Sequence, residues 1–272
     1  MKASQLQKTI NYASFFNASL TLEGLHFWLI SPKKHSLVEV RNLLTKHPSL
    51  KKKIISTKDK YLLKKTRLTN QKIKTVQKLV NVLKIVPSIK LIALTGSLSV
   101  NNPKKRDDID LMIVVTPNTL WLTRPLVIFL TSTLSIRRKP RGMVTTNTIC
   151  TNLWLDQLNL TVPKNKQNLY TAHEVLQTKP LFDRGGVHQQ FVKKNIWTKK
   201  YLATAYNQIA KTSKISPLKV SQPNWLIEKL NLLFFKLQYL YMKPKITKEH
   251  ITLHSAYFHP RNLYLKIKKH LF

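Results

Sequence analysis

The first third of the chain has apolar positions with helical spacing, followed by a short β-like pattern. Apolar residues three or four apart predict a helix over residues 4–16 and a second short helix after it. Ser36 and Glu39 form a capping box that begins a third helix. The runs 53–56 and 61–63 have β-like composition, with polar residues between them. Three helices and a hairpin are typical of a winged helix-turn-helix, and a small helical subdomain is the alternative.

The middle of the chain changes from helical to strand-like periodicity. An amphipathic helix is predicted over about 69–86, ended by Pro87. Apolar runs at 89–95 and 109–115 predict two strands, and an apolar helix at 118–136 and a third strand at 146–155 follow.

The remainder of the chain reads as helical. Helices are predicted at 167–178, 187–197, 201–211, 224–242 and 263–270. Helices around a central group of strands indicate the α/β (α+β) fold class with a mixed sheet.

Composition narrows the class of protein. The 272 residues are 43% hydrophobic, which is ordinary for a folded chain and unlike a disordered polycation. The single Cys excludes an internal disulfide framework and a cysteine-rich zinc module. The most apolar stretch is interrupted by Pro117, Arg124 and Pro125, so no membrane span is predicted. The first residues lack a signal-peptide pattern, and the expected location is cytoplasmic.

The charge balance is strongly basic. Forty-seven Lys and Arg against 11 Asp and Glu give a net charge of +36, which attracts polyanions such as RNA or DNA. The basic residues are spread along the chain, so a solvated basic surface explains them as well. The scarce acids carry more information, because Asp107, Asp108 and Asp110 fall within four positions.

These acids follow a turn suited to phosphate. Gly96 and Ser97 end the first strand, where glycine lets a phosphate approach the backbone. On the next strand, Asp108 and Asp110 share one face while Ile109 and Leu111 share the other. Two such carboxylates suit divalent cations, and hard oxygen ligands favour Mg²⁺ (or Mn²⁺).

This combination resembles the polymerase-β-type nucleotidyltransferase superfamily. Leu94-Thr95-Gly96-Ser97, a gap, and Asp108-Ile109-Asp110-Leu111 match its pattern, and the strings 168–175 and 179–186 are similar to uncharacterised bacterial nucleotidyltransferase-domain proteins. The resemblance implies that Gly96 and Ser97 hold the triphosphate of an NTP and that Asp108 and Asp110 hold the metals. Lys104 and Lys105, in the loop before the acids, are candidates to neutralise triphosphate charge.

The superfamily usually has a third carboxylate on a neighbouring strand. Asp156, at the end of the third strand, is the only acid there and is the candidate third catalytic and metal-binding residue. Cys150, Asn152, Trp154 and Asp156 are expected on one face. If Asn152 lies opposite the acid pair instead, the third acid is missing.

These patterns divide the chain into four predicted parts. They are a winged-helix-like domain (1–66), a connecting helix (67–87), a nucleotidyltransferase domain (88–165) and a helical C-terminal region (166–272).

Three functional hypotheses remain open. The first is an enzyme that moves a nucleoside monophosphate from an NTP to an acceptor hydroxyl on RNA, a small molecule or a protein. The second is a winged-helix nucleic-acid-binding regulator with a degenerate transferase domain. The third is a toxin–antitoxin-like nucleotidyltransferase that modifies a protein.

Overall fold

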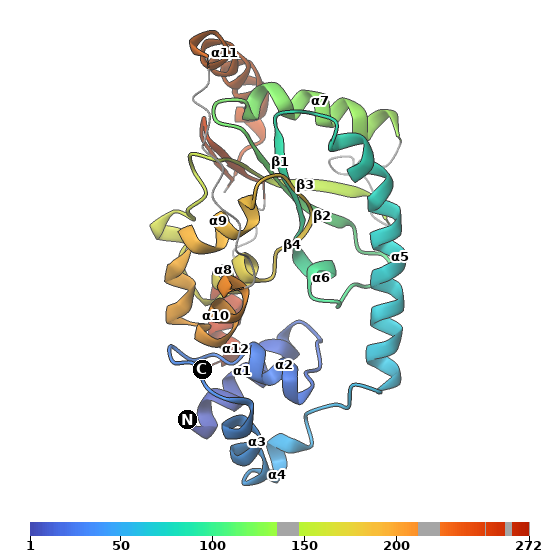
Figure 1. The fold of residues 1–272 in the computed structure, drawn as a ribbon, viewed down its shortest axis with the longest axis vertical. Coiled ribbons are helices and arrows are strands. Elements are labelled where there is room, and N and C mark those ends of the chain that lie inside the picture. The colour runs from blue at the N-terminus through green and yellow to red at the C-terminus, as the bar shows by residue number, and fades with distance from the viewer. Residues whose placement is uncertain (135–146, 212–223, 248, 259–262, 272) are drawn as a thin grey trace.

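The chain folds around one mixed β-sheet. The computed structural model describes residues 1–134, 147–211, 224–247, 249–258 and 263–271. Within these residues the sheet has six strands in the order β4-β1-β2-β3-β6-β5 (Figure 1). Only β2 and β3 run parallel, and every other pair is antiparallel. The strands are β1 (Ile89–Leu94), β2 (Ile109–Val115), β3 (Ile149–Asp156), β4 (Lys179–Asp183), β5 (His250–Ile251) and β6 (Ser255–Tyr257).

Helices cover both faces of the sheet. One face packs against α5 (Lys60–Leu83) and α7 (Leu120–Thr133), with α11 (Trp225–Met242) beside α7. The other face packs against α8 (Leu169–Leu176), α9 (Val187–Lys194) and α10 (Ala203–Lys211). Short 3₁₀ turns lie at Lys164–Lys166, Ile196–Lys200 and Lys243–Lys245.

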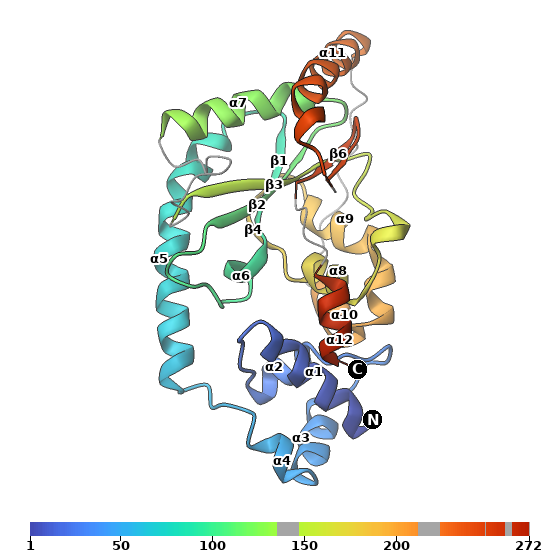
Figure 2. The ribbon, with the colours of Figure 1, turned by 180° about the vertical axis from the view of Figure 1, so that it is seen from behind.

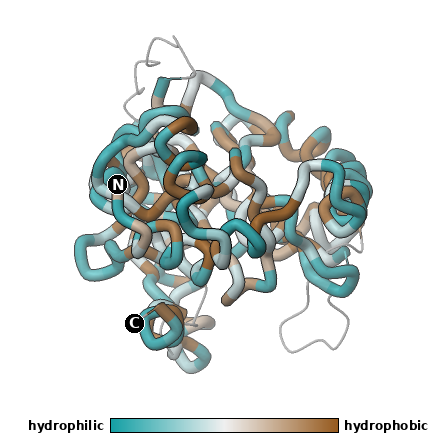
Figure 3. The backbone as a smooth tube through the Cα atoms, turned by 90° about the horizontal axis from the view of Figure 1, so that it is seen from below, coloured by the Kyte–Doolittle hydropathy of each residue, from teal (hydrophilic) through white to brown (hydrophobic). Residues whose placement is uncertain are grey.

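Side chains that alternate along the strands contribute to the hydrophobic cores on both faces of the sheet. In β2, Ile109 and Leu111 point into the α5/α7 core, while Met112 and Val114 point into the α8/α9/α10 core. Hydrophilic segments lie around the periphery and hydrophobic ones toward the interior (Figure 3). The period-2 pattern therefore predicts the sidedness of β2 correctly, and a mixed-sheet α+β fold is observed.

A separate helical unit precedes the sheet. It contains α1 (Ala3–Phe15), α2 (Leu22–Phe27), α3 (Leu37–Thr45) and α4 (Pro48–Lys51) around their own apolar cluster. Ser31 pairs with the chain near Leu202, and α1 packs against α12 (Tyr264–Leu271). The helical unit thus rests against the α8–α10 side of the sheet domain, and α5 runs along the opposite side of the molecule (Figure 2).

The predicted hairpin of a winged helix is wrong. Residues 61–63 lie inside α5, which begins at the Asp59 N-cap rather than near residue 69. Residues 53–56 form no strand. The Asp59 side chain accepts from the backbone N–H of Tyr61, so capping overrides the weak β preference of the Tyr-Leu-Leu run.

The C-terminal region is not wholly helical. Residues 179–183 form β4 and residues 250–251 and 255–257 form β5 and β6, so both edges of the sheet come from the region predicted to be helical. In contrast, α8, α9, α10, α11 and α12 lie close to the predicted positions. None of the helices in the described residues is long and apolar enough to span a membrane.

Candidate functional site

The turn after β1 brings glycine against a carboxylate. Gly96 begins the short helix α6 (Gly96–Ser99) with a φ of +63°, a conformation that favours glycine. A Cβ atom at Gly96 would lie 2.8 Å from Oδ2 of Asp110. The backbone at Gly96 and the Asp110 side chain are therefore packed directly together.

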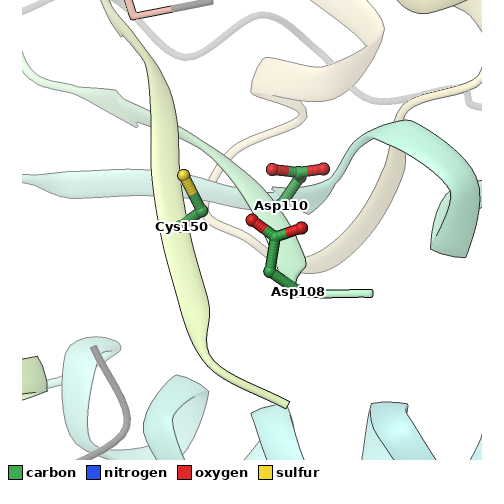
Figure 4. Close-up of side chains that lie close together, drawn as sticks. All are labelled: Asp108, Asp110 and Cys150. Atoms are coloured by element: carbon green, nitrogen blue, oxygen red, sulfur yellow. The ribbon is translucent and has the colours of Figure 1, made fainter. Parts of the chain in front are cut away.

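Asp108 and Asp110 point to the same side at the start of β2. Both are half-buried, and their carboxylates face the thiol of Cys150 on the adjacent strand β3 (Figure 4). One oxygen of each acid and the Cys150 sulfur lie within 4.8 Å of one another. The two oxygens suit one hard divalent cation that also binds phosphate and water, whereas the thiol adds a soft ligand beside them.

Asn152 occupies the position next to the acid pair. Asp110 pairs with Cys150 and Leu111 with Thr151, but Met112 pairs with Leu153, so Asn152 is an extra residue in β3. Its amide Nδ2 donates to Oδ1 of Asp110 over 2.6 Å. The third position beside the pair is therefore an amide, and the pair lacks a third carboxylate from β3.

Asp156 lies elsewhere, so the prediction that it joins the metal pair is wrong. It is opposite Val115 at the far end of β2, five residues beyond Asp110; at about 3.3 Å per residue this is roughly 16 Å. Its side chain is fully buried and accepts from the backbone N–H groups of Asn118 and Leu158. His254 Nδ1 lies 2.8 Å from Oδ2. Asp156 is a structural brace.

The extra residue also overturns the expected shared face of β3. Trp154 packs in the α5/α7 core, whereas Cys150 faces the Asp108–Asp110 pair on the opposite side of the sheet. An irregularity of one residue moves every later side chain to the other face, and strict alternation from Cys150 could not anticipate it.

The loop before the acids is held by Asp107. Oδ2 of Asp107 accepts from the Ser97 hydroxyl (2.9 Å) and from the Lys104 backbone N–H (2.8 Å). Lys72 of α5 is almost fully buried and donates from Nζ to the Asp107 carbonyl. Burial lowers the pKa of Lys72, opposed by the charges of Asp107 and Asp108. Ser97 thus belongs to a braced loop beside the pair.

A cavity of about 1040 Å³ opens onto these residues. It lies between the helical unit and the sheet, and its wall includes Gly96, Ser97 and the three acids. Of the two candidate loop lysines, Lys104 lines it and Lys105 does not. Further cations and aromatic rings complete the wall: Lys65, Arg106, Arg124, Tyr12, Phe16, Trp28, Tyr61 and Tyr170.

Helix α8 supplies the opposite wall through His173 and Glu174. His173 is buried, stacks on Tyr12 with ring centroids 3.9 Å apart, and has no partner for either ring nitrogen among the described residues. Burial lowers the pKa of His173 to about 3, so the ring is neutral near pH 7. Burial raises the pKa of Glu174 to about 7.

The sequence alone did not identify all of these residues. Glu174 faces the cavity, whereas the stacked, neutral ring of His173 beside it is a packing group. Cys150 was expected only on a face shared with Asn152, Trp154 and Asp156, yet its thiol adjoins the acids. The signal for Glu174 was the scarcity of acids, which applied to it as much as to residues 107–110.

Comparison with known proteins adds no family. Neither the protein-family models nor the curated proteins give a match to this chain.

Proposed function

We propose that the protein is a nucleotidyltransferase that moves a nucleoside monophosphate from an NTP to an acceptor hydroxyl and releases pyrophosphate. The observation that carries this proposal is the Asp108–Asp110 pair packed against the positive-φ turn at Gly96, inside a large cavity. A divalent cation there, Mg²⁺ or Mn²⁺, would be bound by Asp108 and Asp110 and would neutralise phosphate charge.

The cavity wall supports a triphosphate substrate. Lys65, Lys104 and Arg106 are cationic groups on the side of the acid pair, where they can bind phosphate oxygens. The aromatic side chains offer flat surfaces for a nucleobase. A volume of about 1040 Å³ is at the upper end of small-ligand sites, so it accommodates an NTP together with the reacting end of an acceptor. The acceptor hydroxyl belongs to a small molecule, an RNA end or a protein side chain.

Asn152 is the observation that favours the degenerate alternative. With an amide beside Asp110, the chain has one pair of carboxylates and no third acid from β3. The lack of a third acid favours a regulator that binds nucleic acid through its basic surface. The affinity of such a regulator for nucleic acid would fall steeply with salt. We favour the enzyme because the hairpin on which the winged-helix hypothesis rested is absent and the cavity is lined by reactive groups.

The proposed activity is tested by which phosphate of the NTP is transferred to the acceptor. The full-length protein is incubated with each NTP carrying ³²P at the α-phosphate, Mg²⁺ or Mn²⁺, and separate RNA, protein and small-molecule fractions. Transfer of α-label and not of γ-label is expected, and it should be lost in Asp108→Asn/Asp110→Asn. Glu23→Gln, an exposed acid in α2, is the matched control. Absence of α-label transfer to every fraction would contradict the proposal.

A further inference from the structure

The eleven acids of this chain differ in what their carboxylates do in the fold. Eight lie in the first turn of a helix or accept hydrogen bonds that cap a helix, close a turn or brace a loop, and all eight lie in the described residues. They are Glu23, Glu39, Asp59, Asp107, Asp156, Asp183, Glu228 and Glu249. The other three are Asp108, Asp110 and Glu174. They line the same cavity as Asp107, and Asp110 accepts a hydrogen bond from Asn152.

Glu174 differs from the other two in where it comes from. Asp108 and Asp110 project from the sheet, whereas Glu174 projects from α8, on the helical side of the cavity. Within the described part of the chain, no hydrogen bond or ion pair holds its carboxylate. A half-buried carboxylate without a partner is costly, so a structural purpose does not explain it.

The adjacent residue fixes the direction of Glu174. His173 is buried between Tyr12 and Trp28, whose ring centroids lie 3.9 Å and 5.5 Å from its own. Because successive side chains on a helix point about 100° apart, anchoring His173 in this aromatic cluster fixes the rotation of α8. His173 is therefore a positioning residue for Glu174.

The two groups of carboxylates are close enough to influence a common neighbour. Burial raises the pKa of Tyr170, and the charges of Glu174 and Asp110 raise it further. Burial also raises the pKa of Tyr12, with smaller contributions from Glu174 and Tyr170. Glu174 therefore lies within electrostatic range of Tyr12 from α1 and Tyr170 from α8, and Asp110 from β2 lies within range of the same Tyr170. The carboxyl itself titrates near neutral pH, as a proton acceptor at physiological pH should.

From these observations we infer that Glu174 is the general base of the transfer reaction, replacing the carboxylate that Asn152 does not supply. The inference rests on the proposed function. The acceptor O–H proton moves to the Glu174 carboxylate as the acceptor oxygen forms a bond to the α-phosphorus. The bond from that phosphorus to the bridging oxygen breaks, and pyrophosphate leaves with the bond's electron pair.

The experiment separates proton transfer from binding. Glu174→Gln and Glu174→Ala are assayed for α-label transfer at saturating NTP, and binding of a non-hydrolysable NTP analogue with Mn²⁺ is measured by calorimetry. The expected result is a kcat at least about 100-fold lower with unchanged analogue binding. Formate, which fits the space left in Glu174→Ala, should restore part of that rate. Glu23→Gln, the same substitution at an exposed acid of α2 outside the cavity, is the matched control and should retain the parent rate.

The outcomes distinguish this inference from the proposed function. Parental kcat in Glu174→Gln, or a change confined to KM without formate rescue, overturns Glu174 as the base while α-label transfer by the parent still supports the enzyme. A parent that transfers no α-label overturns both.

Discussion

Asp110 and Asp156 lie near opposite ends of the β2–β3 pair, and their different surroundings give them different roles. Asp110 is half-buried, opens onto a cavity and has a second carboxylate within 4.8 Å. Asp156 is fully buried and is bound by two backbone N–H groups and His254. A carboxylate whose lone pairs are all used stabilises the fold, whereas one held beside a like charge is available to a cation.

The largest expected effect is on catalysis at the Asp110 end. Asp108→Asn/Asp110→Asn should lower α-label transfer at least about 1000-fold, equivalent to about 4 kcal/mol of transition-state stabilisation. The free energy of unfolding should change little, because the relief of repulsion between two close negative charges offsets the weaker hydrogen bond from Asn152 to residue 110. Urea unfolding and transfer rate are measured on the same preparation. Retained transfer would show that the pair is not the reactive centre.

The corresponding change at the other end should affect stability. Asp156→Asn leaves the N–H groups of Asn118 and Leu158 facing a buried amide and removes the partner of His254. We expect a loss of about 3 kcal/mol in the free energy of unfolding. Transfer per folded molecule should remain within about threefold of the parent. A stable but inactive Asp156→Asn protein would show that Asp156 has a catalytic role after all.

A smaller, mixed effect is expected at the turn that joins the acids to β1. Gly96→Ala puts a Cβ 2.8 Å from Asp110 Oδ2 at a φ of +63°. The backbone strain costs about 1–2 kcal/mol, and the displaced carboxylate should lower transfer about tenfold or more. Ala at Gly24, where the nearest atom is 3.5 Å away, is the control for a helical glycine. Equal behaviour of the two variants would refute the packing of Gly96 on Asp110.

Asn152→Asp tests the missing third carboxylate. The new charge loses the 2.6 Å hydrogen bond to Asp110 and repels it. Without metal, the free energy of unfolding should fall by about 1–2 kcal/mol. Millimolar Mn²⁺ should recover that loss in the variant and stabilise the parent less. A loss that is independent of Mn²⁺ would mean that the three side chains do not form a cation site.

The pH dependence of the free energy of unfolding should reveal the raised pKa of Glu174. Its folded-state pKa, about 7, is raised above its ordinary value of 4.5, so the folded chain holds more protons than the unfolded chain between these values. The stability that the Glu174 carboxyl contributes to the folded state is therefore fully present below pH 4.5 and is lost as pH rises through 7. Glu174→Gln should become more stable than the parent by about 1 kcal/mol at pH 8, after allowing for partial solvent access. A constant difference between pH 4.5 and 8 would contradict the raised pKa.

Much of the fold follows from local pattern, and its departures have local causes. Alternation at 109–115 predicted which side Asp108 and Asp110 face, and the Gly96 turn was visible as a strand end. The extra residue at Asn152 was not, because a bulge is a property of the pairing between two strands. For the same reason Asp156 was misassigned, since its distance from Asp110 depends on that register.

Glu174 shows what sequence patterns leave out. The cavity lies between α8 and the face of the sheet that carries Asp108 and Asp110, and the helical unit lines it too, so its wall is assembled from elements far apart in the chain. Likewise β4, β6 and β5 are short strands at the two ends of the sheet, and their partners decide their structure more than their own residues do.

Binding of Mn²⁺ tests the different roles of Asp110 and Asp156 most directly, because the measurement needs no acceptor substrate. Electron paramagnetic resonance of Mn²⁺ with a non-hydrolysable NTP analogue should show a bound ion in the parent protein and in Asp156→Asn. It should show at least about tenfold weaker binding in Asp110→Asn. Binding that survives Asp110→Asn and is lost in folded Asp156→Asn would contradict the assignment of the cation site to the Asp108–Asp110 end.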